Sequence, residues 1–156
     1  MVVRALWEGL GPLCEEIRVA DRPGLREAGP VVHLHTPITG RLRQGVDLLH
    51  VAQRLHPSPA VGGWPSSAAR AYLEARDPEP EGLYRGLVGE LRPSGDGELH
   101  VALRLAHVRP DGARLWAGAG IVEGSDPSAE WDETEWKLGV LRQTLEELLA
   151  SQGAST

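Results

Sequence analysis

One stretch limits the possible folds more than any other. In residues 116–137, WAGAGIVEGSDPSAEWDETEWK, a turn of small residues leads directly into a helix. Asp126 is a suitable N-cap and Pro127 a suitable first helical residue, because a proline there loses no intrahelical hydrogen bond. The helix is predicted to run from Ser128 to about Ala150. Apolar residues at helical spacing predict one buried face, formed by Trp131, Leu138, Leu141, Leu145 and Leu148.

The same helix carries a stripe of charge beside its apolar face. Glu130, Glu133 and Lys137 are spaced i, i+3 and i+7, which at about 100° per residue places them within roughly 60° of one another. Two carboxylates and an ammonium there can hold a metal or an anion, and the Gly118–Gly120 turn leaves backbone N–H groups accessible to a ligand. The alternative is a solvent-exposed helix with an ordinary Glu133–Lys137 pair, contributing only about 0.3–0.5 kcal/mol.

Length and composition exclude several classes of protein. The 156 residues predict one domain over 1–150, followed by a disordered tail at 151–156. A net charge of −6, without a cluster of basic residues, argues against a nucleic-acid partner. Cys14 is the only cysteine, so there is no internal disulfide, and a reducing cytoplasm fits. No run of 18 apolar residues is present, so no membrane partner is expected.

The remaining patterns predict an α+β fold with packed helices. Residues 83–122 contain turn signals at SGDG (94–97) and PDG (110–112), which predict a three-stranded antiparallel meander. Helix 2–10 begins without a capping residue, which indicates that its first turns lie upstream of this chain. The other predicted elements are a strand at 15–20, a loop at 21–30, a strand at 31–40, a helix at 46–55, a loop at 56–65 and a helix at 66–75.

Five blocks of this sequence resemble the C-terminal part of the chorismate-utilising enzymes, in the same order and spacing. They are HLHTPITG (33–40), LHPSPAVGGWP (55–65), GLYRGLVG (82–89), GDGELHVALR (95–104) and AGAGIVEGSDPSAEWDETEWK (117–137). Within that family, PAVGG at 59–63 is similar to the isochorismate synthase form, where relatives that make anthranilate resemble SGAPK.

The resemblance implies a partial chorismate-binding-enzyme fold and an Mg²⁺-dependent reaction in the cytoplasm. Chorismate is converted to isochorismate as water adds at C2 and the C4 hydroxyl leaves, for menaquinone or siderophore biosynthesis. Chorismate carries two carboxylates, so its site needs fixed cations and backbone donors, and Mg²⁺ prefers a few oxygen ligands with several waters.

The resemblance also assigns individual residues. Glu133 matches the family's direct Mg²⁺ ligand, and Glu130 matches its neighbour that holds the metal, often through water. Lys137 matches a lysine near the substrate carboxylates. The remaining matches surround the substrate: Tyr84 and Arg104 at the enolpyruvyl carboxylate, Gly118, Ala119 and Gly120 in the turn beside it, and Ala60 and His33 near the ring. Alternative interpretations remain for three of them, with Arg104 a surface charge, Tyr84 an ordinary strand aromatic and His33 a packing residue.

The family's general base lysine, its general acid glutamate and a further metal-ligating glutamate would lie upstream of Met1. The sequence therefore predicts a fragment with little activity of its own and with exposed apolar surface where the rest of the domain would pack. Two alternatives remain open. One is a subunit that complements a separate N-terminal half, and the other is a non-catalytic remnant that binds only Mg²⁺ or an aromatic acid.

Overall fold

The computed structural model describes residues 1–28, 31–76 and 82–153, and the chain divides into two compact units. The first unit comprises Met1–Arg76 with Gly89–Leu99, and the second comprises Asp77–Val88 with His100–Thr156. Each unit is described by itself. Within the described residues, no helix is long and apolar enough to cross a membrane.

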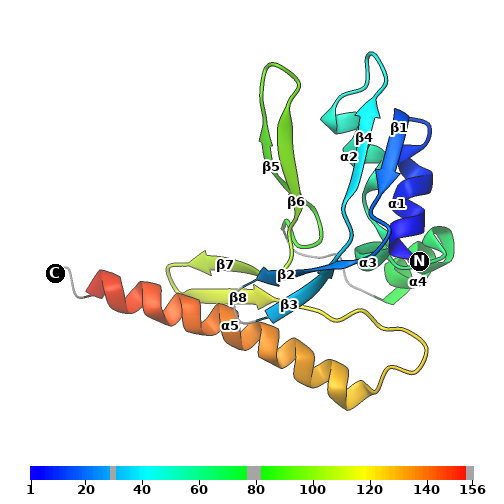
Figure 1. Cartoon of the computed structure of the whole chain (residues 1–156). Helices are drawn as coiled ribbons and strands as arrows, with labels where there is room; N and C mark the ends of the chain where they lie inside the picture. The colour runs from blue at the N-terminus through cyan, green and yellow to red at the C-terminus, as the bar shows by residue number, and fades with distance from the viewer. Residues whose placement is uncertain (29–30, 77–81, 154–156) are drawn as a thin grey trace. The chain divides into compact units, whose positions relative to one another are not determined.

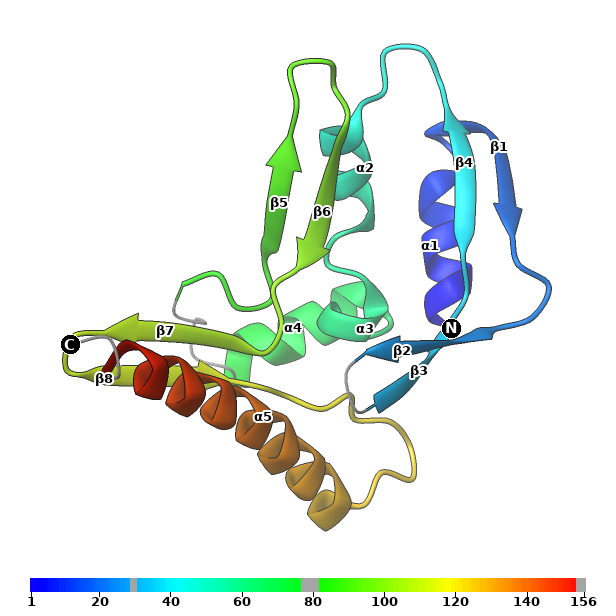
Figure 2. The same ribbon diagram turned by 60° about the vertical axis from the view of Figure 1, so that its left-hand side comes forward.

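The first unit combines helices with two antiparallel strand pairs. Its helices are α1 (Val2–Leu10), α2 (Leu48–Leu55), α3 (Pro59–Gly62) and α4 (Ser66–Arg76). Its strand pairs are β1 (Cys14–Val19) with β4 (Ile38–Leu42), and β2 (Gly24–Ala28) with β3 (Val31–His35). The β2–β3 pair lies between β1 and β4 in sequence and leaves the β1–β4 pair at an angle (Figure 1, Figure 2).

Two predictions for this unit were wrong because a hairpin was not recognised. The loop predicted at 21–30 contains β2, and the strand predicted at 31–40 is divided into β3 and β4 around Pro37. Residues 25–27, Leu-Arg-Glu, show no alternation of apolar and polar side chains. The segment forms a strand because Leu25 pairs with Leu34 and Glu27 with Val32. The helices predicted at 2–10, 46–55 and 66–75 are confirmed, while the loop predicted at 56–65 contains the short helix α3.

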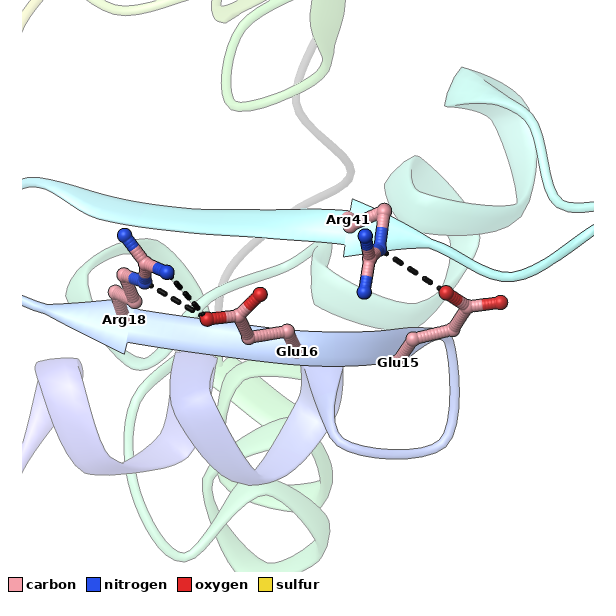
Figure 3. A network of polar contacts seen from close by, with 4 residues as sticks. All are labelled: Glu15, Glu16, Arg18 and Arg41. Carbon is pink, nitrogen blue, oxygen red and sulfur yellow. Dashed lines mark hydrogen bonds and ion pairs between the residues drawn. The ribbon is translucent and has the colours of Figure 1, made fainter.

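Close approach of β1 and β4 buries the single cysteine. The side chain of Cys14 is 3% exposed, and a Cβ atom placed on Gly40 would lie 2.9 Å from its Sγ. Only a glycine at position 40 therefore leaves room for the sulfur without displacing a strand. On the outside of the same strand pair, Arg41 faces Glu15 and Arg18 faces Glu16 (Figure 3), in solvent-exposed pairs that contribute little to stability.

The second unit carries the long C-terminal helix on a hairpin. The strands β7 (Leu105–Arg109) and β8 (Gly112–Trp116) pair antiparallel, and α5 (Pro127–Gly153) runs along them (Figure 2). The predicted cap of α5 is confirmed, since Asp126 accepts the Ala129 N–H at 2.9 Å. The helix continues to Gly153, and the rest of the predicted tail, residues 154–156, lies outside the described residues.

The predicted three-stranded meander is wrong, because four strands form two separate hairpins. β5 (Leu87–Leu91) pairs with β6 (Gly97–Val101), and β7 pairs with β8. The alternation in residues 100–109 suggests one strand, but the backbone turns at 102–104. Ala102 N–H donates to Gly86, its carbonyl accepts from Arg85, and Arg104 adopts a left-handed φ of 51°. These local bonds end β6 before the chain reaches β7.

The buried face predicted for α5 is narrower than expected. Leu138, Leu141 and Leu145 are half-buried, whereas Trp131 is 67% exposed and Leu148 is 54% exposed. A two-stranded hairpin covers a narrow strip of a helix, so residues at the margin of the apolar stripe remain uncovered. Those two positions of the predicted buried face are therefore corrected.

Candidate functional site

Lys137 joins the helix α5 to the small-residue segment 118–120, which was predicted to be a turn but forms irregular backbone without one. Its Nζ donates a hydrogen bond to the carbonyl oxygen of Gly118 at 2.8 Å and pairs with Oε1 of Glu133 at 2.5 Å. The lysine side chain is only 16% exposed, whereas that of Glu133 is 51% exposed. Lys137 is also the only lysine in the sequence. One half-buried ammonium thus links segment 118–120 to a carboxylate of α5.

The electrostatics of Glu133 reflect this arrangement. Hydrogen bonding from Lys137, and then its charge, hold the pKa of the Glu133 carboxyl below its usual range, and the charge of Arg104 adds a smaller effect in the same direction. Arg104 therefore contributes to the electrostatics of Glu133. Its backbone lies at the left-handed break between β6 and β7.

Tyr84 approaches segment 118–120 from another part of the same unit. A Cβ atom built on Gly118 would lie 2.9 Å from the Tyr84 hydroxyl oxygen, so the phenol comes close to bare backbone. The guanidinium of Arg85 lies over the Tyr84 ring, 5.9 Å from its centroid. Tyr84, Gly118 and Lys137 therefore meet at one place, although they are far apart in sequence.

Glu130 lies one turn before Glu133 and has a different partner. Its Oε1 accepts a hydrogen bond from the hydroxyl of Ser125 at 2.7 Å, and Ser125 is half-buried. Sequence reasoning missed Ser125 because a serine before an Asp-Pro pair resembles an ordinary loop residue. The sequence signals Ser125 only by its position, in the loop that leads into α5 and five residues before the Glu130 carboxylate.

The second unit thus contains eight of the ten predicted site residues. Four of them are in contact with one another: Tyr84, Gly118, Lys137 and Glu133. Arg104 acts on Glu133 through its charge, Ala119 and Gly120 follow Gly118 in irregular backbone, and Glu130 lies one helical turn before Glu133. The other two belong to the first unit, with Ala60 in α3 and His33 in β3, paired with Arg26. The cluster in the second unit forms without them.

The charges of this cluster suit two ligands at once. Glu130 and Glu133 together balance a divalent cation, while Lys137 and Arg104 together balance a dicarboxylate. No group of three or more His, Cys, Asp or Glu side chains gathers among the described residues, so a cation here would take further oxygens from water or from a ligand.

A pH titration checks the Glu133–Lys137 pair. Replacing Lys137 by Met is expected to raise the pKa of Glu133 toward its ordinary value, because the donor and the positive charge that lower it are removed. In the unmodified chain the folded-state pKa is below the unfolded one. The pair therefore stabilises the fold above the unfolded-state pKa, and this stabilisation is lost as the pH falls through the folded-state value.

The measurement is a carboxyl NMR titration between about pH 2 and pH 6. Arg142→Met, which removes another cation from α5, is the matched control and should leave the Glu133 titration in place. An unchanged Glu133 pKa in the Lys137→Met variant would contradict the pairing.

Comparison with known proteins places this fold and site in one family. Residues 1–146 match the family model described as chorismate binding enzyme, so the chain belongs to the chorismate-binding enzymes. Isochorismate synthases are among the relatives that it matches. The salicylate biosynthesis isochorismate synthase of Pseudomonas aeruginosa is 41% identical over 93% of the chain, and isochorismate synthase EntC of Escherichia coli is 37% identical over 90%.

A solved structure agrees with the family. The chain superimposes on a crystal structure of 2,3-dihydroxybenzoate-specific isochorismate synthase, DhbC, from Bacillus anthracis with a TM-score of 0.86 and 34% identity over 93% of its length. The chain spans only 30% and 36% of the two curated relatives and 39% of the crystallised one. The likeness therefore covers a part of the relatives' domain.

Proposed function

We propose that this chain is the cation- and carboxylate-binding part of an isochorismate synthase, which converts chorismate to isochorismate with Mg²⁺. The observation that carries the proposal is Lys137, which holds Glu133 at 2.5 Å and the Gly118 carbonyl at 2.8 Å. This contact brings a carboxylate, an ammonium and the exposed backbone of a small-residue segment together. A site for a dicarboxylate and a hard cation needs these groups.

The residues present suit Mg²⁺. Glu130 and Glu133 offer carboxylate oxygens one helical turn apart, and Mg²⁺ is commonly bound by one or two carboxylates together with waters and substrate oxygens. When bound, the cation would neutralise charge on the substrate carboxylates and orient them. The loop residues Gly118, Ala119 and Gly120 then present backbone groups to the same ligand.

The other residues bind and orient the substrate. Arg104 offers a planar guanidinium fork that matches a carboxylate, and Tyr84 presents a hydroxyl beside Gly118. Lys137 exchanges its contact with Glu133 for one with substrate. In the proposed reaction water adds at C2 and the C4 hydroxyl leaves, so atoms balance without an oxidant or ammonia.

Proton transfer requires groups beyond this chain. The resemblance assigns the base and the acid to a preceding segment, which would be either part of the same polypeptide or a separate N-terminal half. Each unit supports such a partner, because large apolar side chains are exposed on both: Leu25 is 76% exposed and Leu34 is 77% exposed in the first unit, and Trp131 is 67% exposed in the second. We propose that the missing segment covers part of this surface.

A binding experiment tests the proposal on the chain itself. Chorismate is titrated into the 156-residue protein with and without Mg²⁺, followed by calorimetry. We expect Mg²⁺ to tighten chorismate binding at least about tenfold, which is about 1.4 kcal/mol, because cation and dianion neutralise each other in the site. Arg104→Gln should weaken chorismate binding, whereas Arg109→Gln at the end of β7 is the matched control. A chorismate affinity that changes neither on addition of Mg²⁺ nor in Arg104→Gln would refute the proposal.

A further inference from the structure

The hydroxyl group of Ser125 both accepts and donates a hydrogen bond, so its orientation is fixed. Its Oγ accepts a hydrogen bond from the Val122 N–H at 3.1 Å and donates to Oε1 of Glu130 at 2.7 Å. The Ser125 N–H in turn donates to the Val122 carbonyl at 3.0 Å. Two hydrogen bonds between Ser125 and Val122 therefore fix the position of the hydroxyl on the loop before α5.

The direction of the hydroxyl follows from counting hydrogens. A serine hydroxyl has one proton, and the Val122 N–H already occupies one of its lone pairs, so the proton points to the Glu130 carboxylate. Ser125, in the loop, therefore holds Oε1 of Glu130, whereas the backbone of Glu130 lies in the first turn of α5. Among the residues that the structure describes, the second oxygen, Oε2, accepts no hydrogen bond.

The two glutamates are held in different ways. Glu133 is held by an ammonium, which neutralises its charge, whereas Glu130 is held by a neutral hydroxyl, which fixes its position and leaves its charge intact. A carboxylate that keeps its charge and has one free oxygen is well prepared to hold a cation. Partners behind a metal ligand that orient it in this way commonly change metal affinity about 10–100-fold.

We infer that Ser125 is a positioning residue for the cation site: it holds the Glu130 carboxylate in the orientation in which that carboxylate meets a divalent cation. This inference rests on the proposed function, since it requires a cation at Glu130 and Glu133. Ser125 acts through Glu130 and touches neither the cation nor the substrate.

Direct titration of Mg²⁺ into the full chain, without substrate, tests this inference. Ser125→Ala is expected to weaken Mg²⁺ binding about tenfold, because the Glu130 carboxylate loses its donor. Ser125→Thr, which keeps the hydroxyl, is expected to restore most of the affinity. The matched control is Ser94→Ala, which removes a similar 3.0 Å hydroxyl bond to Asp96 in the β5–β6 hairpin and should leave Mg²⁺ binding unchanged.

Two further readouts separate positioning from folding. The helical circular dichroism signal and the thermal midpoint without Mg²⁺ report whether Ser125→Ala keeps α5 intact, and Mn²⁺ electron paramagnetic resonance reports the cation environment directly. An Ala variant that binds Mg²⁺ as tightly as the original chain overturns the role of Ser125 alone. Equal losses in Ala and Thr variants with intact helices overturn it too. A chain that binds no cation overturns both this inference and the proposed function.

Discussion

The 156-residue chain is expected to convert chorismate at least about 100-fold more slowly than a hybrid in which it is completed by a relative. Each missing acid or base contributes about 10²–10⁴-fold to a proton-transfer step, and the resemblance assigns both groups to the preceding segment. A suitable hybrid joins residues 1–146 to the preceding part of the Pseudomonas aeruginosa isochorismate synthase, which is 41% identical to this chain. Isochorismate formation is measured in a coupled assay with Mg²⁺.

The hybrid needs a control that separates folding from chemistry. Glu135→Gln, placed on α5 beside the cluster, should leave the hybrid's activity intact, and the thermal midpoint reports whether the two parts have packed together. If the chain alone were as fast as the hybrid, the assignment of base and acid to the missing segment would be wrong. A folded hybrid that binds Mg²⁺ and chorismate yet remains inactive would show that this chain has lost a group that its relatives use. Arg85, whose guanidinium lies over the Tyr84 ring, would then be the first residue to replace by one with a small side chain.

The start of α5 was predictable because its signals are local. Asp126 and Pro127 specify a cap and a first turn whatever surrounds them, and the structure contains the predicted Asp126 hydrogen bond. The spacing of Glu130, Glu133 and Lys137 likewise follows from helical geometry alone. Within one helix, the sequence is sufficient to place charges on a common face.

The strands were less predictable because their ends depend on bonds between distant residues. Alternation in residues 100–109 continues through Arg104, and only the hydrogen bonds of Ala102 to Arg85 and Gly86 reveal that the strand has ended. β2 shows the opposite error, since a loop-like sequence pairs with β3. Trp131 has helical spacing but lies beyond the strip that the β7–β8 hairpin covers.

The site was partly predictable for the same reasons. Helical periodicity predicted that Glu130, Glu133 and Lys137 share one face of α5. The contact of Lys137 with Gly118, 19 residues away, and that of the Ser125 hydroxyl with Glu130 depend instead on the conformation of the chain before the helix. Neither contact has a periodic signal. The resemblance supplied Arg104 and Tyr84, and the geometry adds physical reasons: the charge of Arg104 reaches Glu133, and the Tyr84 hydroxyl approaches Gly118.

Replacing Glu133 by Gln is expected to weaken Mg²⁺ binding by more than about 100-fold, because removing a ligand costs more than removing a partner behind it. The amide keeps the size of the side chain but loses its charge, and Lys137 keeps its bond to the Gly118 carbonyl. Glu133 is half-exposed and pairs with Lys137 at i,i+4, so its contribution to stability is only about 0.3–0.5 kcal/mol. The free energy of unfolding should therefore hardly change.

This difference between binding and stability distinguishes a ligand from a structural ion pair. Mg²⁺ affinity is measured by calorimetry and the free energy of unfolding by urea denaturation, on Glu133→Gln and on the control Glu135→Gln. If Glu133 serves only to hold Lys137, both variants bind Mg²⁺ alike and Glu133→Gln shows at most a small loss of stability. If Glu133 is a ligand, Mg²⁺ binding is lost in Glu133→Gln alone, while both variants unfold at nearly the same urea concentration.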